Sequence, residues 1–168
     1  SYFGARHWRW DEDAAIAFAA HKAGATSTST DIGAATFGKV GVGTTPHVLE
    51  NVMAWKYGKD SAVLETIKAF DRVIDSNVAR IPLVDYRNRE IDDTVLSARA
   101  LGDRFYGPRI DTCGENLAQG AARTKEELFE KLGRRLDIPE EELRYWVGNG
   151  VTVSGVYAVK KELTEIGR

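Results

Sequence analysis

Apolar residues in the second half of the chain fall into two patterns, one at helical spacing and one in short runs. From Val63 to Ile74 they recur every three or four positions, which predicts an amphipathic helix over 61–75. Ser61 is expected to cap its amino end, because its hydroxyl can accept from free N–H groups there. The same spacing, with Thr124 and Glu127 as a capping box, predicts further helices at 91–101, 124–136 and 158–166.

Short apolar runs separate these predicted helices. They occupy 80–85, 108–112 and 151–155, and the first two contain Asp85 and Asp111 at or next to their ends. Alternating strands and helices are typical of parallel βα units, joined by right-handed crossovers. The pattern therefore predicts the α/β class, either as an open sheet or as part of a (β/α) barrel.

The first half of the chain is less regular. An alanine-rich segment predicts a helix over 11–22 that Gly24 ends, and Thr30 or Asp31 begins a short helix that reaches Phe37. A brief strand is predicted at 39–44 and a helix at 48–57. Because no linker, repeat or low-complexity tract divides the sequence, we expect 1–168 to form one α/β barrel-type domain.

Composition narrows the class of protein. The chain has 168 residues, is 43% hydrophobic and carries a formal net charge of −2, so no basic surface for nucleic acid or an anionic membrane is expected. No apolar run approaches the ~20 residues of a membrane-spanning helix. The single Cys113 excludes an internal disulfide and fits a cytoplasmic protein. The chain opens without Met and closes on a helical pattern, which suggests an internal piece of a longer polypeptide.

Polar residues gather at the predicted carboxyl ends of strands, where parallel α/β folds bind ligands. The set consists of Arg6, His7, His47, Asp85, Arg109, Asp111, Ser154 and Gly155. Cations, carboxylates and a Ser-Gly turn at a helix start suit an anionic, hydroxyl-rich ligand such as a sugar phosphate. Backbone N–H groups at the helix start would bind phosphate, and carboxylates would bind ribose hydroxyls or a Mg²⁺ that bridges pyrophosphate oxygens.

Each of these residues also has a structural interpretation. An Asp at a strand end is more often a helix cap or turn former, and His47 is as well placed for capping as for binding. Arg6 lies near Trp8 in sequence and can stack on it. Cys113 has no evident base beside it, so a thiol nucleophile is not expected. No HExxH, CxxC or Walker-type segment is present, so a protein-held zinc site and a P-loop are not expected.

Several segments resemble a known enzyme family in the family's own order. Phe3–Arg6 resembles its Phe-Gly-x-Arg segment, and Gly43–Leu49 is similar to the Gly-Thr-x-Pro-His-x-Leu motif of archaeal-type nicotinate phosphoribosyltransferases. Arg80–Asp85, Arg109–Thr112 and Val153–Gly155 follow in the expected order. The resemblance extends over almost the whole chain.

The resemblance implies an irregular type II phosphoribosyltransferase barrel beside a second domain. It implies transfer of phosphoribose from phosphoribosyl pyrophosphate to nicotinate, giving nicotinate mononucleotide and pyrophosphate for NAD synthesis. His47, Asp85 and Asp111 would be catalytic, with His47 at the position that is phosphorylated in ATP-coupled members. The implied substrate contacts are Arg6, His7, Thr44, Arg109, Thr112, Ser154 and Gly155. Mg²⁺ would accompany the pyrophosphate, ATP would serve as a coupling substrate, and the whole enzyme would be a homo-oligomer.

The chain departs from the family at three places and lacks two of its parts. His7, Val156 and Cys113–Asn116 stand where relatives carry Arg, Gly and an Arg-rich stretch. We expect the family's amino-terminal domain and late glycine-rich phosphate loop to lie outside these 168 residues, so this piece alone is expected to hold only part of a site. The alternatives are a quinolinate or nicotinamide phosphoribosyltransferase of the same fold, or a non-catalytic barrel fragment with an assembly or regulatory role. Quinolinate, with two carboxylates, would demand more Arg and Lys.

Overall fold

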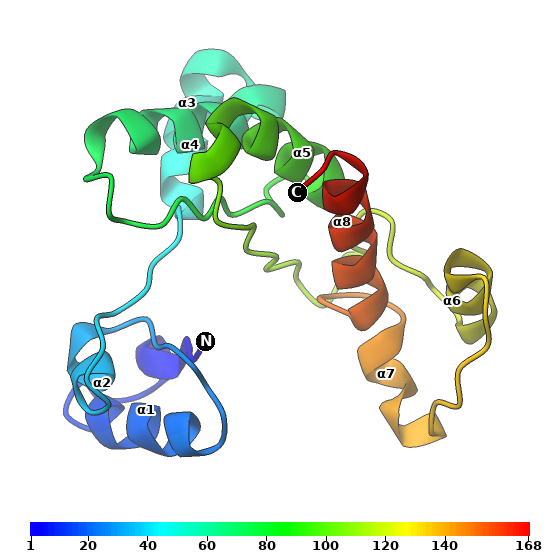
Figure 1. Ribbon diagram of the computed structural model, residues 1–168, viewed down its shortest axis with the longest axis horizontal. Helices are drawn as coiled ribbons and strands as arrows, with labels where there is room; N and C mark the ends of the chain where they lie inside the picture. The colour runs from blue at the N-terminus through cyan, green and yellow to red at the C-terminus, as the bar shows by residue number, and fades with distance from the viewer. The chain divides into compact units, whose positions relative to one another are not determined.

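The computed structural model describes residues 1–168 and divides them into two compact units, Ser1–Gly43 and Thr44–Arg168 (Figure 1). The first unit contains η1 (Gly4–His7), α1 (Asp13–Lys22) and α2 (Asp31–Ala35). The Ser- and Thr-rich segment 26–30 connects α1 to α2. Within it, Thr28 forms an isolated parallel bridge with Tyr2, and Thr30 caps α2 by accepting from the N–H of Gly33. Gly33 allows α1 and α2 to approach closely, since a Cβ there would lie 2.7 Å from the Cβ of Ala17.

The second unit is built from helices that pack in succession, α3 on α4, α4 on α5 and α5 on α8 (Figure 1). Its elements are α3 (His47–Tyr57), η2 (Lys59–Ser61), α4 (Ala62–Val73), α5 (Glu90–Leu101), η3 (Gly102–Arg104), α6 (Lys125–Leu132), η4 (Glu140–Glu142), α7 (Leu143–Trp146) and α8 (Val153–Glu165). Extended segments run between α4 and α5 and between η3 and α6.

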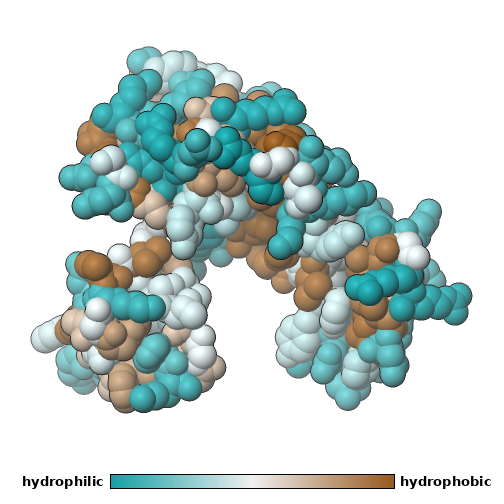
Figure 2. Space-filling model, viewed as in Figure 1, coloured by the Kyte–Doolittle hydropathy of each residue, from teal (hydrophilic) through white to brown (hydrophobic).

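The core of the second unit is made largely of small side chains. Ala62, Ala98 and Ala122 are fully buried, and Ile67, Leu83 and Leu128 are the largest fully buried side chains. Small residues let helices approach closely but bury little apolar area each. Large apolar side chains lie instead on the surface of both units, where Figure 2 shows hydrophobic patches among hydrophilic ones.

Arg80 connects α4 to the extended segment that follows it. Its guanidinium group is almost fully buried and donates to the carboxylate of Asp71 at 2.9 Å and to the carbonyl oxygens of Ile74, Asp75 and Val78. Those carbonyls lie at and beyond the end of α4, where no intrahelical donor remains for them. The interaction therefore fixes where the segment 80–85 begins.

The predicted α/β class and its partial barrel are wrong. The chain is mostly helical and contains no sheet; the four β-bridges are isolated and parallel. Segments 80–85 and 105–109 do run side by side, with bridges at Arg80–Phe105 and Leu83–Arg109. Pro82 and Pro108 have no N–H to donate, and the N–H of Leu83 bonds to a side chain, so no continuous ladder forms.

The strands predicted at 39–44 and 151–155 are also wrong. In the first segment the N–H of Gly41 donates to the carboxylate of Asp31 and the N–H of Val42 donates to the carbonyl of Thr28, and this single backbone bond does not extend into a ladder. In the second segment Thr152 caps α8 by accepting from the N–H of Gly155, and the residues after it are already helical. The capping hydroxyl decides for helix over strand here.

The predicted helices are confirmed, with changes at their ends. Ser61 occupies the N-cap position of α4 but makes no capping hydrogen bond with its side chain. Thr124 caps α6 as predicted, and Glu127 accepts from the N–H of Arg123, one residue before the cap. The helix predicted at 158–166 begins five residues earlier, at Val153. That 1–168 forms a single domain stays a prediction.

Candidate functional site

Thr45 anchors the Gly-Thr-Thr-Pro-His segment to the neighbouring extended segment. Its side chain is buried; its Oγ1 accepts from the N–H of Leu83 at 2.9 Å and its own N–H donates to the carbonyl of Ile81 at 3.1 Å. Two bonds from one residue fix both the position and the direction of the chain. Pro46 follows in an extended conformation, and α3 begins at His47.

This anchoring brings His47 and Asp85 together although 38 positions separate them in the chain. The Nε2 atom of His47 lies 3.0 Å from Oδ1 of Asp85. The imidazole is 44% exposed, whereas the Asp85 side chain is only 10% exposed. His47 therefore contacts Asp85 rather than capping α3, and its ring presents an open face to solvent.

Glu50 is a member of this cluster that the sequence analysis did not identify. It lies one helical turn after His47, fully buried, with Oε2 4.0 Å from Nε2 of His47. Neither of its carboxyl oxygens has a hydrogen-bond partner. Burial, followed by the charges of Asp85 and Asp93, raises the pKa of Glu50 to about 8. The sequence signal was a carboxylate at i+3 from a candidate histidine, on the same face of the helix.

Arg109 and Asp111 form a second charged pair in the same unit. A guanidinium N–H of Arg109 donates to Oδ2 of Asp111 at 2.5 Å, and another donates to Oγ1 of Thr44 at 3.4 Å. The Asp111 side chain is 41% exposed. The N–H of Val84, next to Asp85, donates to the carbonyl oxygen of Arg109 at 3.1 Å, and Arg109 contacts Thr44, so both pairs belong to one cluster. The structure thus brings together Thr44, His47, Asp85, Arg109 and Asp111. These residues and Glu50 form the His47 cluster.

Thr112 faces away from this cluster into a buried network. Its hydroxyl donates to Oε1 of Glu90 at 2.7 Å, and Oε2 of Glu90 accepts from the N–H of Gln119 at the same distance. The Gln119 side chain in turn accepts from the first N–H groups of α5, at Ile91 and Asp92. The network holds the segment after Asp111 against α5; a substrate contact by Thr112 stays a prediction.

Ser154 and Gly155 lie in the first turn of α8. The Ser154 hydroxyl accepts from the N–H of Ala122 at 3.0 Å, and the N–H of Gly155 donates to Thr152. A Cβ at Gly155 would lie 3.3 Å from the Cβ of Ala118, so the glycine permits close packing. These groups have structural partners, and their predicted contact with a 5′-phosphate stays a prediction.

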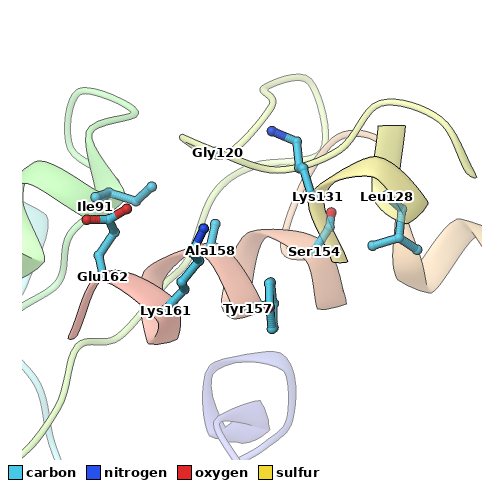
Figure 3. Close-up of a pocket in the computed structure, with 9 residues that line it drawn as sticks. All are labelled: Ile91, Gly120, Leu128, Lys131, Ser154, Tyr157, Ala158, Lys161 and Glu162. Atoms are coloured by element: carbon cyan, nitrogen blue, oxygen red, sulfur yellow. The ribbon is translucent and has the colours of Figure 1, made fainter. Parts of the chain in front are cut away.

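A pocket of about 190 Å³ opens beside Ser154 (Figure 3). Lys131 from α6 and Lys161 from α8 line it together with apolar side chains of α5 and α8. Both lysines also approach glutamates of their own helices, Glu127 at 3.5 Å and Glu165 at 3.9 Å. The two ammonium groups and the carboxylate of Glu162 give this pocket a lining of mixed charge next to the predicted phosphate position.

Arg6 and His7 belong to the other unit, in the last turn of η1. Both side chains are exposed. The structure does not relate these two residues to the His47 cluster, which belongs to the second unit. Their role as substrate contacts stays a prediction.

The His47 cluster combines the groups that sugar-phosphate chemistry uses. An exposed imidazole held by a carboxylate can bind or transfer a proton, or stabilise an anion. The Arg109–Asp111 pair adds one guanidinium group and one carboxylate nearby. No three His, Cys, Asp or Glu side chains are grouped so as to hold a metal ion. None of the helices has the length and apolar character needed to cross a bilayer.

Comparison with known proteins adds one solved structure. The chain is similar to the crystal structure of nicotinate-nucleotide pyrophosphorylase from Pyrococcus furiosus, with a TM-score of 0.57 and 29% sequence identity. The similarity covers 80% of this chain and 33% of that one, so the chain spans about a third of that protein's length. No model of a protein family matches the chain, and no curated protein matches it by sequence.

Proposed function

We propose that the protein transfers a phosphoribosyl group from phosphoribosyl pyrophosphate to a pyridine carboxylate in NAD biosynthesis, with nicotinate as the acceptor. The observation that carries the proposal is the His47–Asp85 pair beside the Arg109–Asp111 pair. Its support is the similarity to a nicotinate-nucleotide pyrophosphorylase, a protein whose name refers to the same nucleotide and pyrophosphate.

The charges of the cluster suit this reaction. Departure of pyrophosphate from C1 of the ribose leaves positive, oxocarbenium-like charge on the sugar. The carboxylates of Asp85 and Asp111 would stabilise that charge, and the guanidinium group of Arg109 would bind an anionic oxygen of the leaving group. The ring nitrogen of nicotinate attacks C1, so the enzyme needs no nucleophile of its own there.

The proposal includes a Mg²⁺ ion bound to the pyrophosphate group of the substrate. Mg²⁺ in such enzymes is held by one or two carboxylates together with substrate phosphates, and it stabilises negative charge on the leaving group. Asp111 is the fitting residue, because its carboxylate is an oxygen donor and is 41% exposed. ATP as a coupling substrate, with His47 as the phosphorylated group, is part of the same proposal; its imidazole is exposed enough to be reached.

The test is a transfer assay on the intact protein. Phosphoribosyl pyrophosphate and Mg²⁺ are incubated in turn with nicotinate, nicotinamide and quinolinate, with and without ATP, and mononucleotide formation is followed by chromatography. We expect product from nicotinate, and more of it when ATP is present. Product from quinolinate or nicotinamide alone would overturn the acceptor, and no product from any acceptor would favour a non-catalytic role.

We propose further that the whole protein is a homo-oligomer. The outer face of α3 supports this, because Val48, Val52 and Trp55 are each more than half exposed and recur at helical spacing. Light scattering after size exclusion would show a multiple of the protomer mass. Trp55→Ser would lower that mass, whereas Val73→Ser, at an exposed position on α4, would leave it unchanged.

A further inference from the structure

Glu50 occupies a position in α3 at which helices ordinarily place an apolar residue. It is the buried residue of that helix, while the neighbouring Val48 and Val52 are exposed. A buried carboxyl group without hydrogen-bond partners costs free energy, and the cost is far larger for its ionised form. Packing alone therefore does not explain why this face of α3 carries an acid.

The charges around Glu50 come from several segments. Asp85 and Asp93 raise its pKa and Arg109 lowers it, but burial has the largest effect, and the result is a pKa of about 8. The other charged groups of the neighbouring elements are engaged in ion pairs of their own: in α4 Glu65 pairs with Lys68 and Asp71 with Arg80, and in η2 Asp60 pairs with Arg87. Near neutral pH the carboxyl group of Glu50 is uncharged.

We propose that Glu50 is a positioning residue that acts through His47: its uncharged carboxyl group lies behind the imidazole and leaves Asp85 as the one negative charge at Nε2. The distances carry this assignment, since the same Nε2 atom lies 3.0 Å from Asp85 and 4.0 Å from Glu50. The inference rests on the proposed function, because it concerns the site of phosphoribosyl transfer.

Loss of the Glu50 proton would change the site in two ways. A second carboxylate would compete with Asp85 for Nε2 and draw the ring away from its open position. It would also add negative charge beside the site of an anionic substrate, where little water screens it. Turnover is therefore expected to fall once the pH rises above the point at which Glu50 ionises.

The experiment compares the pH dependence of kcat/KM for phosphoribosyl pyrophosphate in the wild-type protein and in Glu50→Gln, from pH 6.5 to 9.5. Glutamine keeps the size of the side chain and stays uncharged. We expect a fall in the wild-type profile centred near pH 8 that is missing in Glu50→Gln, leaving the variant roughly tenfold more active than wild type at pH 9. Glu65→Gln, which removes a partly exposed carboxylate of α4, should keep the fall.

A second measurement does not depend on turnover. Nitrogen NMR of the His47 ring should show a step near pH 8 in the wild-type protein that is missing in Glu50→Gln. An unchanged alkaline fall in Glu50→Gln, or identical ring titrations in the two proteins, would overturn the proposal. If the wild-type protein transfers nothing at pH 7 but the ring step is present, the proposed function fails while the coupling of Glu50 to His47 stands.

Discussion

The side chain of Thr45 accepts a hydrogen bond from the backbone N–H of Leu83 at 2.9 Å. In a continuous sheet the N–H of Leu83 would donate to a backbone carbonyl of a neighbouring strand. Here the hydroxyl of Thr45 is the acceptor instead. Since His47 lies two residues after Thr45 and Asp85 two residues after Leu83, the bond sets the distance between the imidazole and the carboxylate. The conformation of the Gly-Thr-Thr-Pro-His segment is thus directly connected to the geometry of the cluster.

Replacing Thr45 by Val should therefore affect both stability and activity. The shape is kept, but the buried N–H of Leu83 loses its acceptor, at a cost of about 1–3 kcal/mol in the free energy of unfolding. Urea denaturation measures that loss, and kcat should fall as His47 shifts. Thr45→Ser retains the hydroxyl and serves as the control; equal losses in the two variants would contradict this explanation.

The pair of His47 and Asp85 should be needed for turnover and not for folding. His47→Ala removes a half-exposed ring, and we expect kcat to fall on the order of 100-fold with an unchanged circular dichroism spectrum. Asp85→Asn should also lower kcat, because it removes the negative charge beside the His47 ring. Tyr86→Phe, which removes only a bond to Asn51, is the matched control. Unchanged kinetics in His47→Ala would return that residue to a structural role.

Stability should fall with rising pH because of Glu50. Its pKa is about 8 in the folded protein against an ordinary value of 4.5, so the folded state binds the proton more tightly than the unfolded state. The stabilising contribution is complete below about pH 4.5 and is lost as the pH rises toward 8, at about 1.4 kcal/mol for each pKa unit.

Glu50→Gln should flatten this dependence between pH 5 and 8, as measured by urea denaturation at fixed ionic strength. Asp93 contributes in the same direction, because burial raises its pKa from 3.8 to about 6. Asp93→Asn should therefore flatten only the lower part of the curve, below about pH 6. A wild-type curve that rises between pH 5 and 8 and is the same in Glu50→Gln would rule this account out.

Arg80 should be the most costly charged residue to remove from the second unit. Arg80→Ala leaves several buried carbonyl groups without donors and leaves the Asp71 carboxylate only its exposed partner Arg104, so a loss of about 3–5 kcal/mol is expected. Arg87→Ala, which breaks an exposed ion pair with Asp60, should cost under about 1 kcal/mol. Thermal denaturation of both variants tests the difference, and similar losses would argue against a central role for Arg80.

Much of the candidate site could be predicted because its residues follow short extended segments. Asp85 and Asp111 were placed at the ends of such segments, and those segments do lie side by side at Leu83 and Arg109. Glu50 could not be found in this way, because its raised pKa depends on burial in the folded chain and on the charges of Asp85, Asp93 and Arg109, which come from later parts of the chain. A helix with exposed valines and a buried glutamate reverses the ordinary pattern, so periodicity alone gives the wrong face.

The sequence by itself determined where most of the helices lie, because hydroxyl caps such as Thr30 and Thr124 and the apolar spacing after them need no partner from elsewhere in the chain. Only the tertiary structure decided whether the extended segments join into a sheet, since a ladder needs a donor at each step and Pro82 and Pro108 remove two of them. It also decided that His47 and Asp85 meet, because 38 positions of chain separate them and a buried threonine hydroxyl closes that distance.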